Sequence, residues 1–554
     1  MPLNSSDYHL LIVSDLHLSE GRSERTHRIQ RNEDFFQDEE FTRFLEYHLS
    51  IEAERKWHLI INGDFLDFLQ VISTDFDPEF LAYLGVKTAK EARQLLHIVD
   101  QQSRFGFDAG PGETVFKLWK ILDGHWIFTL ALIRFLERGH ALSIGRGNHD
   151  PEFQYPLVQE HFHRMLAWFY ARKLEGQHTP EQVKQFEDVC AERVHFLDWF
   201  YYEPGLIWAE HGGQYDAENA FSHWLAPYLP HSDQIEMPWG SFFVRYLFNS
   251  IENEEPWADN IKPQSRFIIW LITRRPVLAL RFLFGNGRTM LKKMAHAWRP
   301  LPADDPRQAE HDRRRAELAQ EWNIDETTLG DFDAHQAPGV LREPHGWWRL
   351  FKVLTRGWRI SLPLLALILL TILIGGILIL AQILAPIVPA IMRSSMSATL
   401  HAHGALQSFV SFLLISRGFT TVYLLIALGY FIWQLFPHPA AEPYLRSKAK
   451  YVREKLGVQY VTMGHTHETD LDGISGEGEY FNTGTWTKVI SDDEELFAQE
   501  SELVFLQVLR RDRDVSCRLM RWHDGANEPR LVKLFSDVGV PKKKKQNKPK
   551  VAHA

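Results

Sequence analysis

The sequence predicts an α/β protein whose strand-forming segments are interrupted by a helical insertion and by a two-helix transmembrane hairpin. Three observations lead to this prediction. Five short apolar runs each end in a group of polar side chains, as the buried strands of an α/β sheet do. Two stretches between the fourth and the fifth run contain no charged residue. With 554 residues, the chain is also too long for one ordinary domain.

The five apolar runs are rich in Val, Ile and Leu, and we expect each of them to form a strand. They cover residues 9–14, 58–62, 141–145, 206–210 and 458–463. The motifs directly after them read Asp15-Leu16-His17, Gly63-Asp64-Phe65-Leu66-Asp67, Gly147-Asn148-His149-Asp150, His211-Gly212-Gly213 and Gly464-His465-Thr466-His467. Ligands at the carboxyl ends of such strands converge in one crevice, so the motifs predict a single site. Carboxylate, imidazole and amide oxygen together suit a pair of divalent cations.

In these five motifs the chain resembles the calcineurin-like metallophosphoesterase family, whose pattern is D-x-H, G-D-x-x-D, G-N-H-D/E, H and G-H-x-H. The resemblance covers roughly residues 7–220 and 455–520, and it implies a four-layer αββα sandwich. It also implies how the ligands are divided between two metals. One metal would be bound by Asp15, His17, Asp64 and His467, and the other by Asn148, His211 and His465, with Asp64 as the bridge.

The resemblance also implies roles for residues that do not bind metal. His149 matches the family's histidine that contacts the scissile phosphate and can protonate the leaving oxygen. Asp67 is expected either to orient His149 or to cap the following helix. Asp150 precedes Pro151 and is expected to cap the next helix, because Pro favours the first helical position. The Asn-Thr-Gly-Thr-Trp segment at 482–486 is expected to form a tight turn after a strand.

The expected function is hydrolysis of a phosphate ester or pyrophosphate by a metal-activated hydroxide. Mn is the expected metal, ahead of Fe and Zn. The SDLHLS opening and the His-Gly block followed by Tyr215 and Asp216 are similar to UDP-2,3-diacylglucosamine hydrolases, which implies a lipid-linked or nucleotide substrate. Those enzymes usually have Arg where this chain has His149, and they lack a membrane hairpin. The alternative is a non-catalytic scaffold or binding module with the metallophosphoesterase fold.

Two uncharged stretches, at 361–392 and 418–436, predict the transmembrane hairpin. A membrane helix needs about 20 apolar residues, so we expect spans at about 362–385 and 415–436. Basic residues flank the pair on its outer sides. The positive-inside rule then predicts a multi-pass protein of the cytoplasmic membrane, with the catalytic domain and both termini in the cytoplasm.

Residues 261–303 are rich in Phe, Ile, Leu and Trp and carry nine basic residues but no acidic one. This pattern is typical of an interfacial helix pair on anionic lipid, or of a helical cap packed on the catalytic domain. The predicted division of the chain is a metallophosphoesterase domain in two parts at 1–260 and 438–535, a helical insertion with a charged linker at 261–345, the hairpin at 346–437, and a basic disordered tail at 536–554.

Composition restricts the partners. The formal net charge of −10 argues against general affinity for nucleic acid. The expected partners are a phosphorylated substrate and membrane lipid, and the sequence leaves the oligomeric state open. The chain contains two cysteines, Cys190 and Cys517, so it implies no disulfide framework and is compatible with a reducing compartment.

Overall fold

The computed structural model shows a mixed α/β protein with two sheets. The residues that it describes are 7–23, 28–51, 55–99, 104–174, 176–230, 232–251, 271, 274–297, 305–337, 339, 444–472, 478–488, 502–511 and 514–532. The chain divides into two compact units. All helices and strands described below belong to the unit made of residues 1–262, 275–346 and 443–554.

The larger sheet has seven strands in the order β12-β11-β10-β1-β2-β3-β4. Its parallel half contains β1 (Tyr8–Val13), β2 (Lys56–Asn62), β3 (Ala141–Gly145) and β4 (Val194–Leu197). Its antiparallel half contains β10 (Val504–Arg511), β11 (Asp514–His523) and β12 (Glu528–Leu531). In the centre, Leu11 of β1 pairs with Leu59 of β2 on one side and with Gln507 of β10 on the other. Strands from the two ends of the sequence are therefore neighbours.

The smaller sheet has five strands in the order β5-β6-β7-β9-β8. They are β5 (Phe200–Glu203), β6 (Ile207–Glu210), β7 (Tyr460–Met463), β8 (Thr469–Leu471) and β9 (Tyr480–Thr483). β6 and β7 are parallel neighbours, with Trp208 opposite Val461, although the long middle of the chain separates them in sequence. This pairing places the fourth and the fifth motif side by side.

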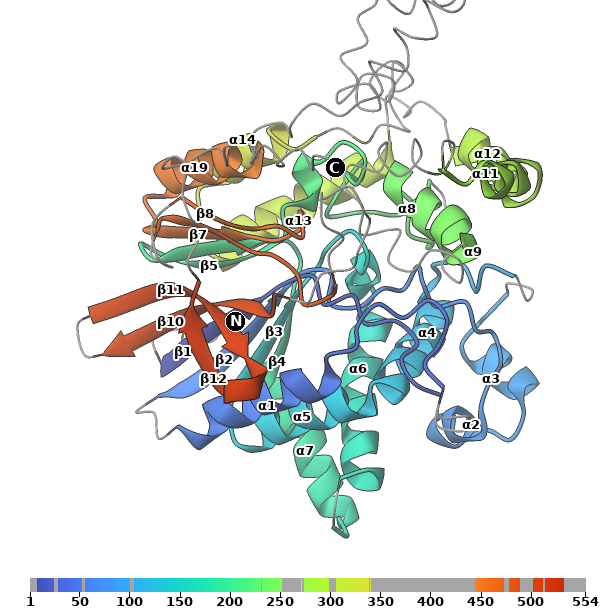
Figure 1. Cartoon of the computed structure of the whole chain (residues 1–554), viewed down its shortest axis with the longest axis horizontal. Coiled ribbons are helices and arrows are strands. Elements are labelled where there is room, and N and C mark those ends of the chain that lie inside the picture. The colour runs from blue at the N-terminus through green and yellow to red at the C-terminus, as the bar shows by residue number, and fades with distance from the viewer. Residues whose placement is uncertain are drawn as a thin grey trace, which may run out of the picture. The chain divides into compact units, whose positions relative to one another are not determined.

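The two sheets pack against each other and carry helices on their outer faces (Figure 1). Leu10 and Ile12 of β1 lie in one apolar cluster with Phe481 of the smaller sheet. The alternate residues Leu11 and Val13 lie in a second cluster, together with residues of the outer helices. Successive side chains of a strand point to opposite faces, so β1 is buried on both sides and accordingly reads as a continuous apolar run.

Helices of two groups form the outer layers (Figure 1). Those beside the larger sheet are α1 (Asp38–Ser50), α5 (Trp126–Glu137), α6 (Pro156–Arg172) and α7 (Pro180–Arg193). Those beside the smaller sheet are α13 (Pro306–Glu321), α14 (Glu326–Ala334) and α19 (Tyr444–Leu456). The ring of Phe332 in α14 meets Trp208 of β6 edge to face, with centroids 5.6 Å apart. Proline at the start of α6, α7 and α13 sets the helical φ at a position that needs no N–H donor.

The remaining described elements connect these layers. Between the second and the third motif lie α2 (Pro78–Leu84), α3 (Ala89–Leu95) and α4 (Pro111–Gly124). Later come α8 (Trp239–Phe243), the π-helix η4 (Val244–Phe248), α9 (Asn249–Ile251), α11 (Pro276–Phe284) and α12 (Asn286–Ala297). Single 3₁₀ turns are η2 (Pro151–Gln154), η3 (Gly213–Tyr215) and η6 (Asp524–Ala526).

The predicted transmembrane hairpin is not supported, and this part of the expected fold is corrected. No helix in the part of the chain that the structure describes is long and apolar enough to cross a membrane. The expected spans at about 362–385 and 415–436 lie outside the described residues. The expectation of a multi-pass protein of the cytoplasmic membrane, with its catalytic domain and both termini in the cytoplasm, is corrected with it. The spans were inferred from the length of two uncharged stretches and from the basic residues beside them, since a helix that crosses a bilayer needs about 20 continuous apolar residues. The division into domains stays a prediction.

An ion pair joins the two sheets. Arg510 of β10 donates from Nη1 and Nη2 to the two carboxylate oxygens of Glu203 in β5, at 2.8 and 2.5 Å. Its Nε also donates to the carbonyl of Tyr8 in β1, at 2.7 Å. Only 7% of the Arg510 side chain and 12% of the Glu203 side chain are exposed. Both charges are thus withdrawn from water, and removal of either one would leave the other uncompensated.

We expect Arg510→Ala and Glu203→Ala each to lower the free energy of unfolding by about 3–5 kcal/mol, the range for breaking a buried ion pair. The double variant should cost less than the sum, because neither charge is then left alone. Denaturant unfolding measures these changes. Lys184→Ala removes an exposed ion pair with Asp188 on α7 and serves as the control, with an expected change within about 0.5 kcal/mol. A cost for Arg510→Ala as small as that of the control would contradict the role given to the pair.

Candidate metal centre

The five motifs follow five strands of the structure. They begin directly after or close to the carboxyl ends of β1, β2, β3, β6 and β7. Two groups of three buried side chains result, each with ligand atoms within 4.8 Å of one another. The groups are Asp15 with His17 and His467, and Asp64 with His211 and His465. The structure thus brings together candidate ligands from four motifs, and Asn148 of the remaining motif joins the second group.

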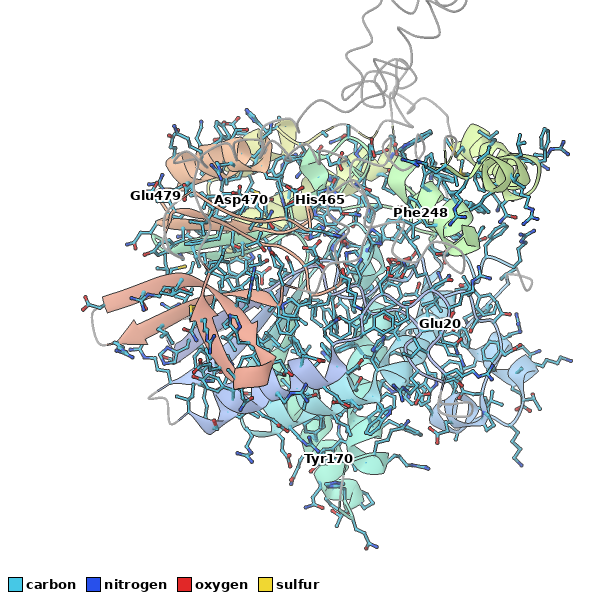
Figure 2. All side chains as sticks on the ribbon, in the orientation of Figure 1. Glu20, Tyr170, Phe248, His465, Asp470 and Glu479 are labelled. Atoms are coloured by element: carbon cyan, nitrogen blue, oxygen red, sulfur yellow. The ribbon has the colours of Figure 1, made fainter. Side chains whose placement is uncertain are left out.

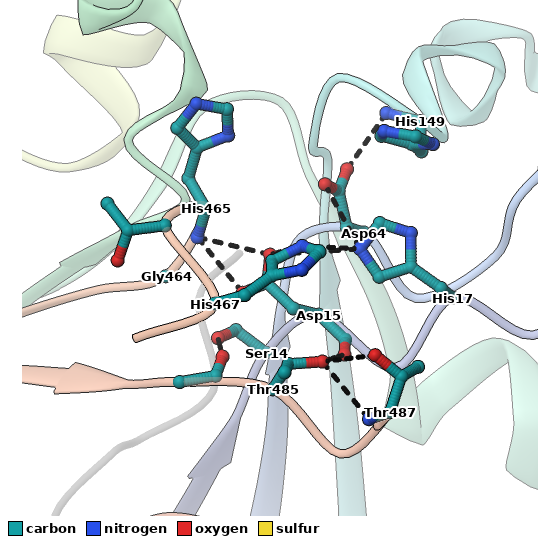
Figure 3. Close-up of polar contacts among 12 residues, drawn as sticks. Ser14, Asp15, His17, Asp64, His149, Gly464, His465, His467, Thr485 and Thr487 are labelled. Atoms are coloured by element: carbon teal, nitrogen blue, oxygen red, sulfur yellow. Dashed lines mark hydrogen bonds and ion pairs between the residues drawn. The ribbon is translucent and has the colours of Figure 1, made fainter. Parts of the chain in front are cut away.

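The first donor group combines the motif after β1 with the motif after β7. Nε2 of His17 lies 3.0 Å from Nε2 of His467 (Figure 3). The same His467 atom lies 3.4 Å from Oδ1 of Asp15, and Nε2 of His17 lies 3.9 Å from that oxygen. Two imidazole nitrogens and one carboxylate oxygen therefore face a common point.

The second donor group combines the motifs after β2, β3, β6 and β7. Nε2 of His211 lies 3.1 Å from Oδ2 of Asp64 and 3.1 Å from Oδ1 of Asn148. Nδ1 of His211 lies 3.2 Å from the carbonyl oxygen of Asn62, which can only accept, so Nδ1 carries the proton. That hydrogen bond fixes the ring and leaves Nε2 as the atom that can bind a metal, as is usual for histidines that bind metal.

The spacing of these atoms fits a cation in each group. Metal–nitrogen and metal–oxygen bonds to a divalent ion such as zinc are about 2.0–2.2 Å long, so ligands at right angles or tetrahedral angles lie about 3.0–3.5 Å apart. The His17–His467, Asp15–His467, Asp64–His211 and Asn148–His211 distances are 3.0, 3.4, 3.1 and 3.1 Å. The buried His and Asp clusters of this protein can therefore bind a metal ion.

Five of the candidate ligands have strained backbone. Among the described residues, nine that are not glycine have a positive φ. The five that belong to the site are Asp15 at 55°, His17 at 50°, Asp64 at 48°, His465 at 70° and His467 at 59°. A side chain with Cβ rarely adopts this left-handed conformation, which costs on the order of 1–3 kcal/mol per residue. Such strain persists where the surrounding structure enforces it, and it concentrates at functional sites.

Two glycines leave room for the carboxylates. A Cβ at Gly147 would lie 2.0 Å from Oδ1 of Asp64, and a Cβ at Gly464 would lie 2.3 Å from Oδ2 of Asp15. Neither distance is compatible with a side chain. The glycines that precede Asn148 and His465 in their motifs are therefore needed because the carboxylates of other motifs approach the backbone at those points.

The sequence did not predict the contact that orients His465. Nε2 of His465 lies 3.1 Å from Oδ2 of Asp216, which follows η3. Nδ1 of His465 and Oδ1 of Asn148 both lie close to Gly213, because a Cβ built there would be 3.4 Å from the first atom and 2.6 Å from the second. Asp216 thus holds one ring nitrogen while the other faces the second donor group. An acidic residue shortly after the His211 motif was the only sequence signal for this role.

Asp150 acts differently from the expectation. Asp150 does not cap η2 through its side chain. Its Oδ2 instead accepts hydrogen bonds from the backbone N–H groups of Phe65 and Leu66, at 2.8 and 3.3 Å, and its Oδ1 accepts one from Gly147, at 2.6 Å. The carboxylate therefore ties the third motif to the second. It can do so because those N–H groups converge on it at the carboxyl ends of neighbouring strands.

The turn at 482–486 supports the site as well. Asn482 donates from Nδ2 to the carbonyl of Gly464 at 2.9 Å, which holds the motif after β7. The hydroxyl of Thr485 donates to the carbonyl of Asp15 at 2.6 Å, as Figure 3 shows for this part of the site. A tight turn was expected here, and its contacts link two of the five motifs.

Asp67 and His149 form a pair beside the donor groups. Nδ1 of His149 donates to Oδ2 of Asp67 at 2.6 Å. Oδ1 of Asp67 accepts from the backbone N–H groups of Leu69 and Gln70, at 3.0 and 3.1 Å. Asp67 thus makes both contacts that the sequence left open, one through each oxygen: it contacts His149 and it caps the backbone that follows.

Burial and charge oppose each other in the site. Burial lowers the pKa of His17, but hydrogen bonds to Asp15 and Asp67 and the charge of Asp64 outweigh it and raise that pKa to about 10. Burial likewise lowers the pKa of His211, whereas Asp64 and Asp15 raise it to about 9. Burial raises the pKa of Asp15 and Asp64, yet nearby histidines, His211 first, hold both well below the usual range. Protons and cations therefore compete for the same nitrogens.

Comparisons with protein-family models, with curated proteins and with solved structures give no match. Membership of the metallophosphoesterase family therefore stays a prediction from the five motifs. The candidate metal centre rests on the geometry of the residues themselves.

Mn²⁺ should stabilise this protein more at high pH than at low pH. The folded pKa values of His17 and His211, about 10 and about 9, lie above the unfolded value of about 6.5. Protonation of these histidines therefore stabilises the metal-free fold fully below about pH 6.5, and this stabilisation is lost as the pH rises through about 9–10. A bound ion replaces these protons, and the free energy needed to remove them falls as the pH increases.

Calorimetry with and without Mn²⁺ at about pH 6 and about pH 8.5 measures the effect. The rise in melting temperature caused by Mn²⁺ should be larger at the higher pH. An equal rise at both values would contradict the assignment of these histidines as ligands.

Proposed function

We propose that this protein is a metal-dependent phosphoesterase that hydrolyses a phosphate ester or a phosphoanhydride at a centre of two divalent cations. The position of Asp64 is the observation that supports this function best. Its Oδ2 lies 3.7 Å from Nε2 of His17 in the first donor group and 3.1 Å from Nε2 of His211 in the second. A carboxylate shared between two donor groups is suited to two ions held about 3.5–4 Å apart, the arrangement found in many phosphatases and nucleases.

The remaining ligands fall on either side of Asp64. Asp15, His17 and His467 would hold one ion, and Asn148, His211 and His465 the other, with Asp64 between them. Mixed carboxylate, amide and imidazole donors suit Mn, Fe and Zn, and we place Mn first. When bound, the two cations would supply an activated water near neutral pH and bind the phosphate oxygens.

His149 is the candidate general acid. Burial lowers its pKa, but the charges of Asp67 and Asp64 outweigh this effect and raise the pKa above its ordinary value. With Nδ1 held by Asp67, Nε2 is the nitrogen that can give a proton to the leaving oxygen. The backbone N–H of the same residue donates to Oδ1 of Asp64 at 2.8 Å. His149 therefore supplies the candidate acid through its ring and holds the carboxylate of Asp64 through its backbone.

The mechanism needs no covalent phospho-enzyme. The side chains assigned above bind, orient and protonate, and water attacks the phosphorus directly from the side opposite to the leaving oxygen. Hydrolysis should therefore invert the configuration at phosphorus. A protein that binds both ions but hydrolyses neither monoesters, diesters nor pyrophosphates would instead be the non-catalytic binding module.

Asp64→Asn should abolish hydrolysis and remove at least one of the two bound ions, because Asp64 is the only side chain assigned to both donor groups. The amide has the size of the carboxylate, so the fold should remain. Metal content by mass spectrometry and turnover of a generic phosphodiester with Mn²⁺ measure the two effects. Asp188→Asn, at an exposed position on α7, is the control and should leave both unchanged. Near-normal activity with two bound ions would show that Asp64 is not the bridge.

His149→Ala should keep both ions and lose rate by roughly 10²–10⁴-fold, the usual range for a general acid. The loss should shrink for a substrate with a good leaving group, since that group departs without a proton. Parallel assays with a nitrophenyl ester and an alkyl ester measure this difference. Loss of metal in this variant, or an equal loss of rate for both esters, would assign His149 another role.

A further inference from the structure

Helices α11 and α12 are attached to the rest of their unit through one face. Met290 and Met294 of α12 and Leu278 of α11 are buried. α12 packs against η4, the element that contains Phe248 (Figure 2). Asn286 at the start of α12 donates from Nδ2 to the hydroxyl of Ser250. These contacts determine which side of the helix pair faces inward.

Other sides of the two helices present large apolar side chains to solvent. Val277, Leu280 and Phe284 of α11 are 64%, 53% and 62% exposed, and Leu291 of α12 is 49% exposed. Val277, Leu280 and Phe284 are three and four positions apart, so they lie on one side of α11. We call these four residues the apolar face of α11 and α12. An isolated exposed Leu needs no explanation, whereas three large apolar side chains exposed together on one side of a helix are typical of a binding surface.

Exposed basic side chains accompany the apolar face. Five exposed cations belong to the two helices or precede them directly: Arg275, Arg281, Arg288, Lys292 and Lys293. The guanidinium carbon of Arg288 lies 5.6 Å from the centre of the Phe284 ring, so charge and apolar surface are in direct contact. The sequence from 261 to 303 contains no acidic residue. The two helices therefore expose apolar and positively charged side chains together.

We propose that the apolar face of α11 and α12 docks on an anionic phospholipid surface. A helix with apolar side chains on one side and Lys or Arg beside them lies in the plane of the headgroups and inserts only its apolar tips. Lys and Arg near an acidic leaflet each add to the attraction, and their long apolar stems let the charges reach the headgroups. With 9 and 12 residues, the helices measure about 13 and 18 Å, which suits lying along a bilayer surface.

Charge favours an anionic lipid surface over two other partners, a second copy of this chain and nucleic acid. A second copy would bring the same five cations against the first five, and like charges facing each other oppose association. Nucleic acid would satisfy the cations but would leave Phe284, Leu280 and Val277 against a charged phosphate backbone. An anionic lipid surface offers acidic groups and an apolar layer at once. The proposal does not depend on the metal centre, and its test has no catalytic readout.

Flotation of the full-length protein with vesicles tests the proposal. One set of vesicles contains phosphatidylcholine with about a third phosphatidylglycerol, and the other contains phosphatidylcholine alone. The double variant Leu280→Asp with Phe284→Asp should bind the anionic vesicles at least about tenfold more weakly than the unchanged protein. The variant Arg281→Glu with Lys292→Glu should also lose binding, and raising the salt concentration should weaken the binding of the unchanged protein.

The matched control replaces exposed apolar residues elsewhere. Leu95 and Val99, at and beyond the end of α3, are 53% and 89% exposed. Leu95→Asp with Val99→Asp should therefore float like the unchanged protein. All substituted side chains are exposed, and equal unfolding midpoints would show that each variant folds.

Three results would overturn the proposal. The first is equal binding of the unchanged protein and the Leu280, Phe284 variant to anionic vesicles. The second is equal binding of the unchanged protein to both kinds of vesicle. The third is absence of vesicle binding together with a sedimentation-measured dimer that the Leu280, Phe284 variant abolishes, which would make the face an interface between copies of this chain.

Discussion

Asp15 is the residue on which the arrangement of the site depends. Both of its carboxylate oxygens accept the backbone N–H of His465, at 3.1 and 3.0 Å. The N–H of Asp15 donates to the carbonyl of Gly63 at 3.1 Å, and its carbonyl accepts from the hydroxyl of Thr485 at 2.6 Å. One residue after the first strand is therefore bound to the loops after β2, β7 and β9. Motifs that are hundreds of positions apart in the sequence meet because this residue connects them.

The same crowding explains why the site is costly to fold and suited to cations. Four motifs bring carboxylates and imidazoles into a buried space, five of these residues have left-handed backbone, and glycines are needed where oxygen atoms approach the chain. Burial of this many ionisable groups is unfavourable unless opposite charges compensate it. Asp216 and Asn482 hold the segment with His465 and His467, and Asp67 holds His149, all from outside the donor groups. Contacts of this kind fix the direction of each ligand and are as necessary as the ligands.

Local patterns predicted the strands and the motifs because both are short-range signals. Residues 141–145 form β3 as expected, and the other four expected strands differ from β1, β2, β6 and β7 by one or two residues at their ends. The runs were readable because both of their faces are buried, which leaves few polar positions in them. The candidate metal ligands were taken from the resemblance to the metallophosphoesterase pattern, in motifs that place Asp, Asn or His where such strands end.

Other features depend on contacts that no local pattern encodes. The pairing of β6 with β7 and of β1 with β10 joins segments from distant parts of the chain, and the sequence contains no signal for their register. Asp150 and Asp216 have the residue types of ordinary caps and loop positions, so only the folded geometry shows that they hold the second motif and His465. The transmembrane hairpin was inferred from uncharged composition, and the described residues contain no helix able to span a membrane.

The central claim is that Asp64 lies between two cations. A crystal grown with Mn²⁺ and measured at the Mn absorption edge tests it directly. The account predicts two anomalous peaks about 3.5–4 Å apart, one among Asp15, His17 and His467 and one among Asn148, His211 and His465, with Asp64 touching both. A single peak, or two peaks of which only one is in contact with Asp64, would contradict it.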